Sequence, residues 1–252
     1  MRRRRNIGLG LAAFLLFCAA TAATAQEKMS APAEMLFRMA NQERTSRGIG
    51  ALKWDASLAD AARHHALRMA DQETLSHQLP GEPDVSMREK NAGAQMSAAA
   101  ENIASGPNVA DIHPGWMHSP GHRHNLLNPQ YDSVGIAVVQ RGELFWAVED
   151  FSRSLEALSL GEQEKIVGKA VRSAGLTVRF ENNDARRVCA GMQPLNSQPI
   201  FIAKFSSTNL STLPESLERT LRSGNYLRAE IGACTKPATD GLSDYHIAVL
   251  LY

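Results

Sequence analysis

The chain has 252 residues, of which 44% are hydrophobic and 21% charged, and its formal net charge at pH 7 is +1. A nearly neutral chain argues against nucleic acid as a partner, because surfaces that bind nucleic acid are strongly basic. No run of like charge is longer than Arg2–Arg5, so the sequence offers no polybasic arm for anionic lipid. The length suits one large or two modest domains.

The N-terminus has the layout of a cleavable secretory signal. Arg2–Arg5 precede an apolar run over Ile7–Ala20, and the small residues Ala23-Thr24-Ala25 precede Gln26. We therefore predict a signal peptide over residues 1–25 and an exported protein, secreted or periplasmic, with a formal charge of about −3. Beyond the signal no stretch approaches about 20 apolar residues, so we expect no transmembrane segment in the mature chain.

Two cysteines, Cys189 and Cys234, follow the predicted signal. An even pair in an exported chain predicts one disulfide, which the chain-entropy model credits with about 4 kcal/mol for a loop of this length. Two buried free thiols are the alternative.

The first part of the chain predicts helices followed by a β-hairpin. The capping and periodicity signals predict helices after Ser30, after Asp55, over Val85–Asn91, and from Ser119-Pro120 to Leu127. The hairpin is predicted from two apolar runs, Val134–Val139 and Leu144–Phe151, joined at Arg141-Gly142. Because strands and helices do not alternate, we expect an α+β fold and not a doubly wound sheet.

The pattern changes near Ser152. A charged stretch over Leu160–Ser173 predicts a helix, and four strand-like runs follow it: Leu176–Glu181, Pro199–Phe205, Tyr226–Ile231 and Tyr245–Tyr252. We therefore divide the mature chain into a first domain over residues 26–152, a helical linker over 153–175, and a small β-rich domain over 176–252 that contains both cysteines.

Several short strings in the first domain occur in a fixed order: Asn41-Gln42-Glu43-Arg44, Leu52-Lys53-Trp54-Asp55, Ser76-His77, Glu101-Asn102-Ile103-Ala104, Trp116, Ser119-Pro120-Gly121-His122-Arg123, Asn125-Leu126-Leu127, Gly135-Ile136 and Asp150-Phe151. Each string alone is a weak signal, but their joint order makes chance a poor explanation. Together they resemble the CAP superfamily of cysteine-rich secretory proteins, antigen-five allergens and plant pathogenesis-related proteins, and in particular its bacterial branch. The resemblance implies an α-β-α sandwich with a cavity on one side of the sheet.

The resemblance also implies which side chains face that cavity, namely His77, Glu101 and His122. Animal members have a glutamate three residues after the tryptophan that matches Trp116, whereas this chain has Ser119 there, as is usual among bacterial relatives. We therefore take His77, Glu101, Ser119 and His122 as candidate ligand-binding residues. We expect His77, Glu101 and His122, each near the end of a segment or in a loop, to meet in one solvent-accessible cleft.

Neutral imidazoles bind zinc and other divalent ions, and a nearby carboxylate orients a ligand histidine. His77 and His122 are therefore candidate ligands of zinc or another divalent metal in an open, exchangeable site. The alternative is that these side chains only hydrogen-bond to one another and brace the neighbouring loops.

The leading hypothesis is an exported, monomeric CAP protein that binds a lipid, a glycan or another envelope component in this cleft, either alone or with a divalent metal. One alternative is a metal-assisted hydrolase in which Glu101 activates a water molecule. The missing fourth acidic residue counts against it, so we assign no catalytic residue. The other alternative is an adhesion protein that acts through its C-terminal domain.

Overall fold

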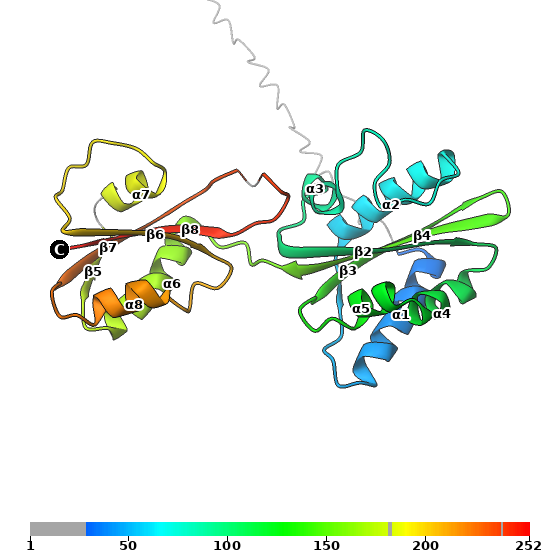
Figure 1. The fold of residues 1–252 in the computed structure, drawn as a ribbon, viewed down its shortest axis with the longest axis horizontal. Coiled ribbons are helices and arrows are strands. Elements are labelled where there is room, and N and C mark those ends of the chain that lie inside the picture. The colour runs from blue at the N-terminus through cyan, green and yellow to red at the C-terminus, as the bar shows by residue number, and fades with distance from the viewer. Residues whose placement is uncertain (1–28, 181–182, 238) are drawn as a thin grey trace, which may run out of the picture.

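The computed structural model describes residues 29–180, 183–237 and 239–252. The predicted signal peptide lies outside these ranges. Two units, each built on its own four-stranded sheet, lie side by side along the long axis of the molecule (Figure 1).

The first unit contains five helices and four strands among its described residues. In chain order they are α1 (Ala31–Thr45), β1 (Lys53–Trp54), α2 (Ala56–Asp71), α3 (Val85–Asn91), β2 (Met96–Gly106), α4 (Val109–His118), α5 (Pro120–Leu127), β3 (Ser133–Arg141) and β4 (Leu144–Ser154).

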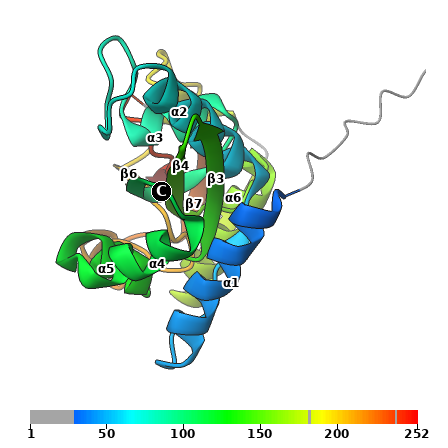
Figure 2. The same cartoon turned by 90° about the vertical axis from the view of Figure 1, so that its right-hand side faces the viewer.

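The sheet of the first unit has the strand order β1-β3-β4-β2, so β2 is an edge strand. Helices α2 and α3 cover one face, and α1, α4 and α5 cover the other (Figures 1 and 2). The result is the predicted α-β-α sandwich. It forms because the strands are apolar on both faces, and each face needs a helical layer to remove it from water.

Side chains cap the first backbone amides at three of the predicted helix starts. Ser30, Asp55 and Asp84 each accept a hydrogen bond from the first turn of α1, α2 and α3. The hairpin between β3 and β4 is also confirmed, with Gly142 at φ +58° in its two-residue turn.

Gly135 on β3 sets how closely α2 approaches the sheet. A Cβ atom there would lie 2.0 Å from the backbone nitrogen of Ala59 and 2.2 Å from the carbonyl carbon of Leu58. Only a residue without a side chain allows this helix to rest directly on the strand.

The second unit contains three helices and four strands among its described residues. They are α6 (Leu160–Ser173), β5 (Thr177–Arg179), α7 (Asp184–Cys189), β6 (Phe201–Ser207), α8 (Glu215–Leu221), β7 (Arg228–Cys234) and β8 (Tyr245–Leu251). The sheet order is β5-β7-β8-β6, with α6 and α8 on one face and α7 on the other. The sequence predicted the four strands but not α7 and α8, which are only six and seven residues long.

Helix α6, which the sequence analysis places in a linker, belongs to the core of the second unit. Val167 and Val171 are fully buried against β7 and β8, and a capping box between Ser159 and Glu162 begins the helix. The connection between the two units is therefore the shorter segment 155–159.

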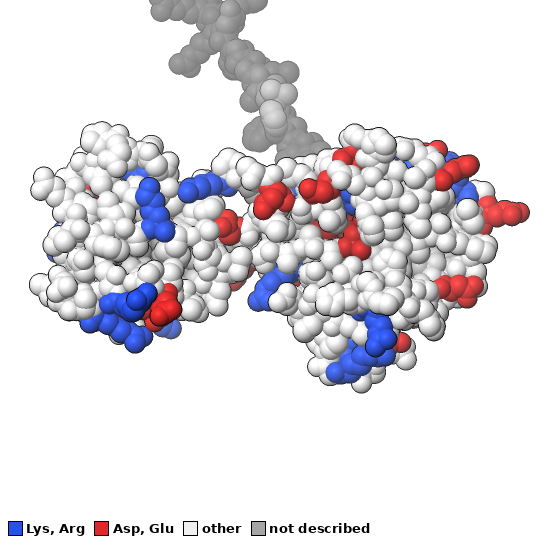
Figure 3. All heavy atoms as spheres, viewed as in Figure 1, with Lys and Arg blue, Asp and Glu red and all other residues white. Residues whose placement is uncertain are grey.

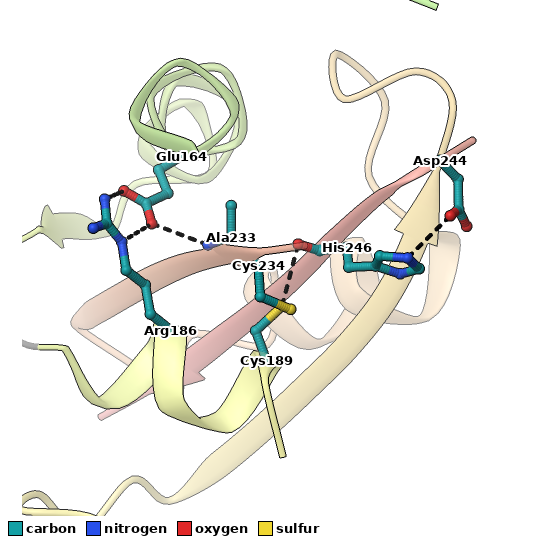
Figure 4. Close-up of a disulfide and its surroundings, with 7 residues drawn as sticks. All are labelled: Glu164, Arg186, Cys189, Ala233, Cys234, Asp244 and His246. Carbon is teal, nitrogen blue, oxygen red and sulfur yellow. Dashed lines mark hydrogen bonds and ion pairs between the residues drawn. A yellow bond between two sulfur atoms is a disulfide. The ribbon is translucent and has the colours of Figure 1, made fainter. Parts of the chain in front are cut away.

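The predicted disulfide joins Cys189 at the end of α7 to Cys234 at the end of β7, with 5.7 Å between the Cα atoms (Figure 4). Beside it, Arg186 on α7 forms an ion pair with Glu164 on α6, and Glu164 also accepts from the backbone amide of Ala233 (Figure 4). These bonds tie α7, α6 and β7 together from both faces of the sheet.

The connection between β7 and β8 reaches the first unit. Ser86 Oγ donates to the carbonyl of Asp240 (2.6 Å), and the amide of Ser243 donates to the carbonyl of Met96 (2.7 Å). Leu242 packs against the small cluster formed by Leu58 and Met96. Within the described ranges, none of the helices combines the length and apolar character needed to cross a bilayer.

Candidate functional site

Glu101 lies in the middle of the edge strand β2, directly opposite Asp150 on β4. The expectation that Glu101 enters a loop was wrong, because the strand runs for eleven residues and pairs along most of its length. Its side chain is 2% exposed on the face of the sheet covered by α2 and α3. A buried carboxylate requires partners, since its desolvation costs several kcal/mol.

Two side chains supply those partners. The His77 Nδ1–H donates to Oε1 of Glu101 (2.7 Å), and the Arg88 guanidinium on α3 forms an ion pair with Oε2. Arg88 also donates to the carbonyl oxygen of His77 (3.0 Å), so a single residue holds both the carboxylate and the backbone beside it.

His65 on α2 fixes the loop that carries His77. The imidazole of His65 is fully buried, and its Nε2–H donates to the carbonyl oxygen of Ser76 (2.9 Å). Its sequence neighbour His64 is exposed on the outer side of the same helix. The hydrogen bond from the buried His65 to Ser76 therefore fixes the backbone immediately before His77.

His77 itself is 59% exposed in its side chain, although its carboxylate partner is buried. The hydrogen bond to Glu101 raises the pKa of His77 above its usual value, because the carboxylate favours the imidazolium form. With Nδ1 engaged, the Nε2 edge is the part of the ring left for a ligand. His77 and Glu101 line a cavity of about 210 Å³ together with Gln78, Asp84 and Val85.

His122 reaches the same edge strand from the other side of the sheet. It lies on α5, and its carbonyl oxygen accepts from the amide of Asn102, the neighbour of Glu101 on β2 (3.1 Å). Asn125 of the same helix donates to the Asn102 side chain (3.0 Å) and to the backbone carbonyl of Glu101 (3.2 Å). Partial burial and the positive charge of His77 lower the pKa of His122, so the two imidazoles favour different protonation states.

The structure thus brings His77 and Glu101 into direct contact. His122 does not contact them, but its helix α5 is hydrogen-bonded to β2 at Glu101 and Asn102. His122 is outside the lining of the His77 cavity. Ser119 occupies the N-cap position of α5, and its hydroxyl makes no capping hydrogen bond.

Sequence reasoning missed a set of buried charged groups around this strand. Glu89 and Asp150 are fully buried on the Glu101 side of the sheet, and Glu149 on β4 is buried on the other side, where it accepts from the Asn102 amide (3.2 Å). Burial raises the pKa of Glu89 to about 10 and that of Glu149 to about 8. Burial, together with the charge of Glu101, raises the pKa of Asp150 well above its usual value.

Arg44 on α1 is a buried basic residue on the face of the sheet that α5 covers. Its buried guanidinium donates to the backbone carbonyls of Gly50, Leu126, Asn128 and Tyr131 at 2.8–2.9 Å. It therefore satisfies the open carbonyls at the end of α5 and in the following loop, and it fixes the helix that carries His122.

Among the described residues, no group of three or more His, Cys, Asp or Glu side chains is arranged to hold a metal ion. A divalent ion at this site would therefore rely on imidazoles and solvent. The donor chemistry of His77 fits such an ion, because its Nδ1 contacts a carboxylate and leaves Nε2 free, as in carboxylate–histidine–metal arrangements.

Comparison with known proteins matches residues 37–151 to the family model described as "CAP: Cysteine-rich secretory protein family". The uncharacterised protein YkwD of Bacillus subtilis is 33% identical over 128 residues, which are 50% of this chain and 49% of that protein. The uncharacterised membrane protein YlbC of the same organism is 29% identical over 109 residues, 42% of this chain and 31% of that protein. The matched segment thus spans half or less of these relatives.

Among solved structures, an extracellular SCP-domain protein from Bacillus anthracis is 29% identical, with a TM-score of 0.46 over 49% of this chain and 40% of that one. An outer surface protein from Borrelia burgdorferi is 20% identical, with a TM-score of 0.48 over 50% of this chain and 96% of that one. The family match covers every element from the middle of α1 to β4, including His77, Glu101 and His122. Residues 37–151 therefore belong to the CAP superfamily, in its bacterial branch.

Proposed function

We propose that this chain is an exported CAP-domain protein that binds an envelope component, a lipid or a glycan, through the His77–Glu101 pair. The observation that carries the proposal is the contrast between the two side chains. The His77 imidazole is 59% exposed, yet its orientation is fixed by a carboxylate that is 2% exposed and held by Arg88. A polar group that is accessible and also preorganised is what a binding site requires.

The chemistry at the exposed ring edge favours a ligand with a hydrogen-bond acceptor, such as a hydroxyl, carboxylate or phosphate oxygen. The raised pKa of His77 increases its protonated fraction near neutral pH, and an imidazolium donates from Nε2. Export is supported by the disulfide, because such bonds persist in oxidising compartments, and by the signal-like sequence of residues 1–25.

Binding is favoured over hydrolysis by the contacts of Glu101. Its Oε1 accepts from His77, its Oε2 is paired with Arg88 and the side chain is 2% exposed, so the carboxylate is held by protein groups and offers little surface to a water molecule. Action through the C-terminal unit as an adhesion module stays a prediction.

The proposal is tested by binding the mature protein to phosphatidylglycerol vesicles in one arm and to purified peptidoglycan fragments in the other. We expect one arm to bind, and His77→Ala to weaken that binding about tenfold, the effect of losing one charge-assisted hydrogen bond. His118→Ala is the matched control, because His118 is an exposed imidazole on α4 whose Nδ1–H donates to Pro114. Equal binding by His77→Ala and wild type, or no binding in either arm, would contradict the proposal.

A divalent metal is a separate part of the proposal, with His77 and His122 as its ligands. Zinc titration of the wild type, His77→Ala, His122→Ala and His118→Ala would test it. Loss of zinc binding in the first two variants alone supports the metal, and unchanged binding in either contradicts this ligand set. Because protons compete for the imidazoles and the pKa of His77 is raised, affinity is expected to begin to fall while the pH is still above the usual histidine pKa of about 6.5.

A further inference from the structure

The two sheets of this molecule have the same internal plan. The first sheet has the order β1-β3-β4-β2 and the second the order β5-β7-β8-β6. In each sheet the first strand pairs in parallel with the third, and the fourth pairs antiparallel with both the second and the third. The second unit therefore repeats the strand plan of the CAP unit in a smaller form.

A glycine marks the corresponding position in each unit. Gly135 on β3 admits α2, and Gly232 on β7 admits α7 in the same way, since a Cβ there would lie 2.1 Å from the backbone nitrogen of Arg186. Each of these helices is the element that directly follows the first strand of its sheet. These two glycines therefore align the two units residue by residue.

The strand registers extend this alignment to the edge strands. Gly135 is paired with Asp150, and Asp150 with Glu101. Gly232 is paired with Ala248, and Ala248 with Lys204. Lys204 therefore occupies in the second unit the position that Glu101 occupies in the first, and it is exposed where Glu101 is buried.

The surroundings of Lys204 are basic. A cavity of about 260 Å³ is lined by Lys204, Lys236, His246 and Ser206, together with Cys189, Phe205 and Ile247. Among the described residues neither lysine forms an ion pair, and the acid beside the cavity, Asp244, is engaged by the His246 imidazole at 3.1 Å (Figure 4). Figure 3 shows basic side chains on the visible face of the second unit.

The disulfide gives this cavity a fixed wall. Cys189 Sγ lies 3.2 Å from the carbonyl oxygen of His246, and Cys234 is the register partner of His246 on β7 (Figure 4). The position of the cavity is thus set by β6, β8 and the end of α7, while Lys236 extends from the β7–β8 connection.

We propose that this cavity is an anion site that takes a phosphate-type oxyanion. Two ammonium groups and the Ser206 hydroxyl provide donors from β6 and the β7–β8 connection around a volume suited to one such group, and His246 lies beside them. The site lies at the register position of Glu101, with a lysine in place of the carboxylate.

The experiment titrates inorganic phosphate into the full mature protein at constant ionic strength and follows the ring resonances of His246 by NMR. We expect a saturable shift that chloride does not reproduce. Lys204→Met is expected to weaken phosphate binding about tenfold, and Lys204→Met/Lys236→Met to abolish it. Lys169→Met is the matched control, because Lys169 is exposed on α6 at the opposite face of the sheet and should leave the titration unchanged.

A second arm uses phosphatidylglycerol vesicles and identifies the source of the oxyanion. Vesicle binding that depends on Lys204 indicates a lipid headgroup, and its absence beside a positive phosphate titration indicates a free oxyanion. The anion site is overturned if phosphate produces no saturable shift, or if Lys204→Met behaves like Lys169→Met. Since Lys204 is exposed, thermal unfolding of Lys204→Met should match that of the wild type and exclude misfolding as the cause.

Discussion

The chemistry of Glu101 depends on residues that sequence motifs identify only in part. Ser76-His77 and Glu101-Asn102 pointed to the His77–Glu101 contact through the family resemblance, but Arg88 was not anticipated. It lies in α3 among other charged residues, and no periodicity distinguishes the buried Arg88 and Glu89 from the half-buried Lys90. Arg88 faces inward because the buried carboxylate of Glu101, which lies on the neighbouring strand β2, requires an opposite charge.

Glu101→Gln tests whether the charge of Glu101 raises the pKa of His77. The substitution removes the negative charge that favours the imidazolium, while the positive charge of Arg88 remains nearby. We expect the pKa of His77 to fall toward or below its usual value. NMR titration of the His77 ring resonances measures this, with the His118 signals as an internal reference. An unchanged His77 titration would show that Glu101 does not control it.

The buried acid Glu149 predicts a pH dependence of stability. Its pKa of about 8 in the folded state exceeds that of an unfolded chain, about 4.5, so the folded state prefers the protonated form. Its stabilising contribution is therefore complete below about pH 4.5 and is lost as the pH rises through about 8.

Glu149→Gln is accordingly expected to lessen the decrease in unfolding free energy between about pH 5 and 8, measured by urea denaturation. Glutamine keeps an acceptor for the Asn102 amide. Glu215→Gln on α8, where the carboxylate is 88% exposed, is the control and should follow the wild type. Equal slopes in all three proteins would contradict the argument.

At the level of elements, local sequence signals predicted the long helices and most strands, but they did not predict the short helices α7 and α8. Helix α6 was predicted with its observed bounds from a charged stretch of fourteen residues. Helices α7 and α8 contain fewer than two turns of periodic pattern each, and they exist because tertiary packing stabilises them. The strand β2 was missed because its Ala-rich sequence has low strand propensity and pairing with β4 overrides that preference.

The close helix–strand contacts give a prediction at this scale. Gly135→Ala and Gly232→Ala each place a Cβ within about 2.2 Å of helix backbone, so the helix must move away from the sheet. We expect each change to destabilise its own unit by about 3 kcal/mol or more, measured by chemical denaturation. Gly106→Ala is the control, because a Cβ at the end of β2 meets nothing within 4 Å and should change stability little. A small effect at Gly135 or Gly232 would show that the helix accommodates the extra atom.

For the whole molecule, the segment Asp240–Ser243 is the point where the second unit supports the first. Gly241 has φ +82° and lies against the first turn of α3, where a Cβ would approach the carbonyl carbon of Ser86 to 2.4 Å. A seven-residue helix has little stability of its own, so external contacts decide its position. Helix α3 carries Arg88, which is paired with Glu101. The contact from the second unit to α3 therefore helps to position Arg88 beside the His77–Glu101 pair.

Gly241→Ala is expected to increase amide hydrogen exchange in α3, although the substitution lies in the second unit. Gly224→Ala is the matched control, since Gly224 also has a positive φ (+76°) but meets nothing within 4 Å. Both variants carry the backbone strain of alanine at positive φ, so a difference between them isolates the contact. If α3 exchanges equally in both variants, the two units are not coupled at this point.

The paired glycines show which positions determine packing and which determine charge in the two units. In each unit the glycine fixes where a helix rests, while the side chain displayed two strands away, Glu101 in one unit and Lys204 in the other, has opposite charge. The packing of the helix and the charge on the edge strand are therefore set at different positions in each unit.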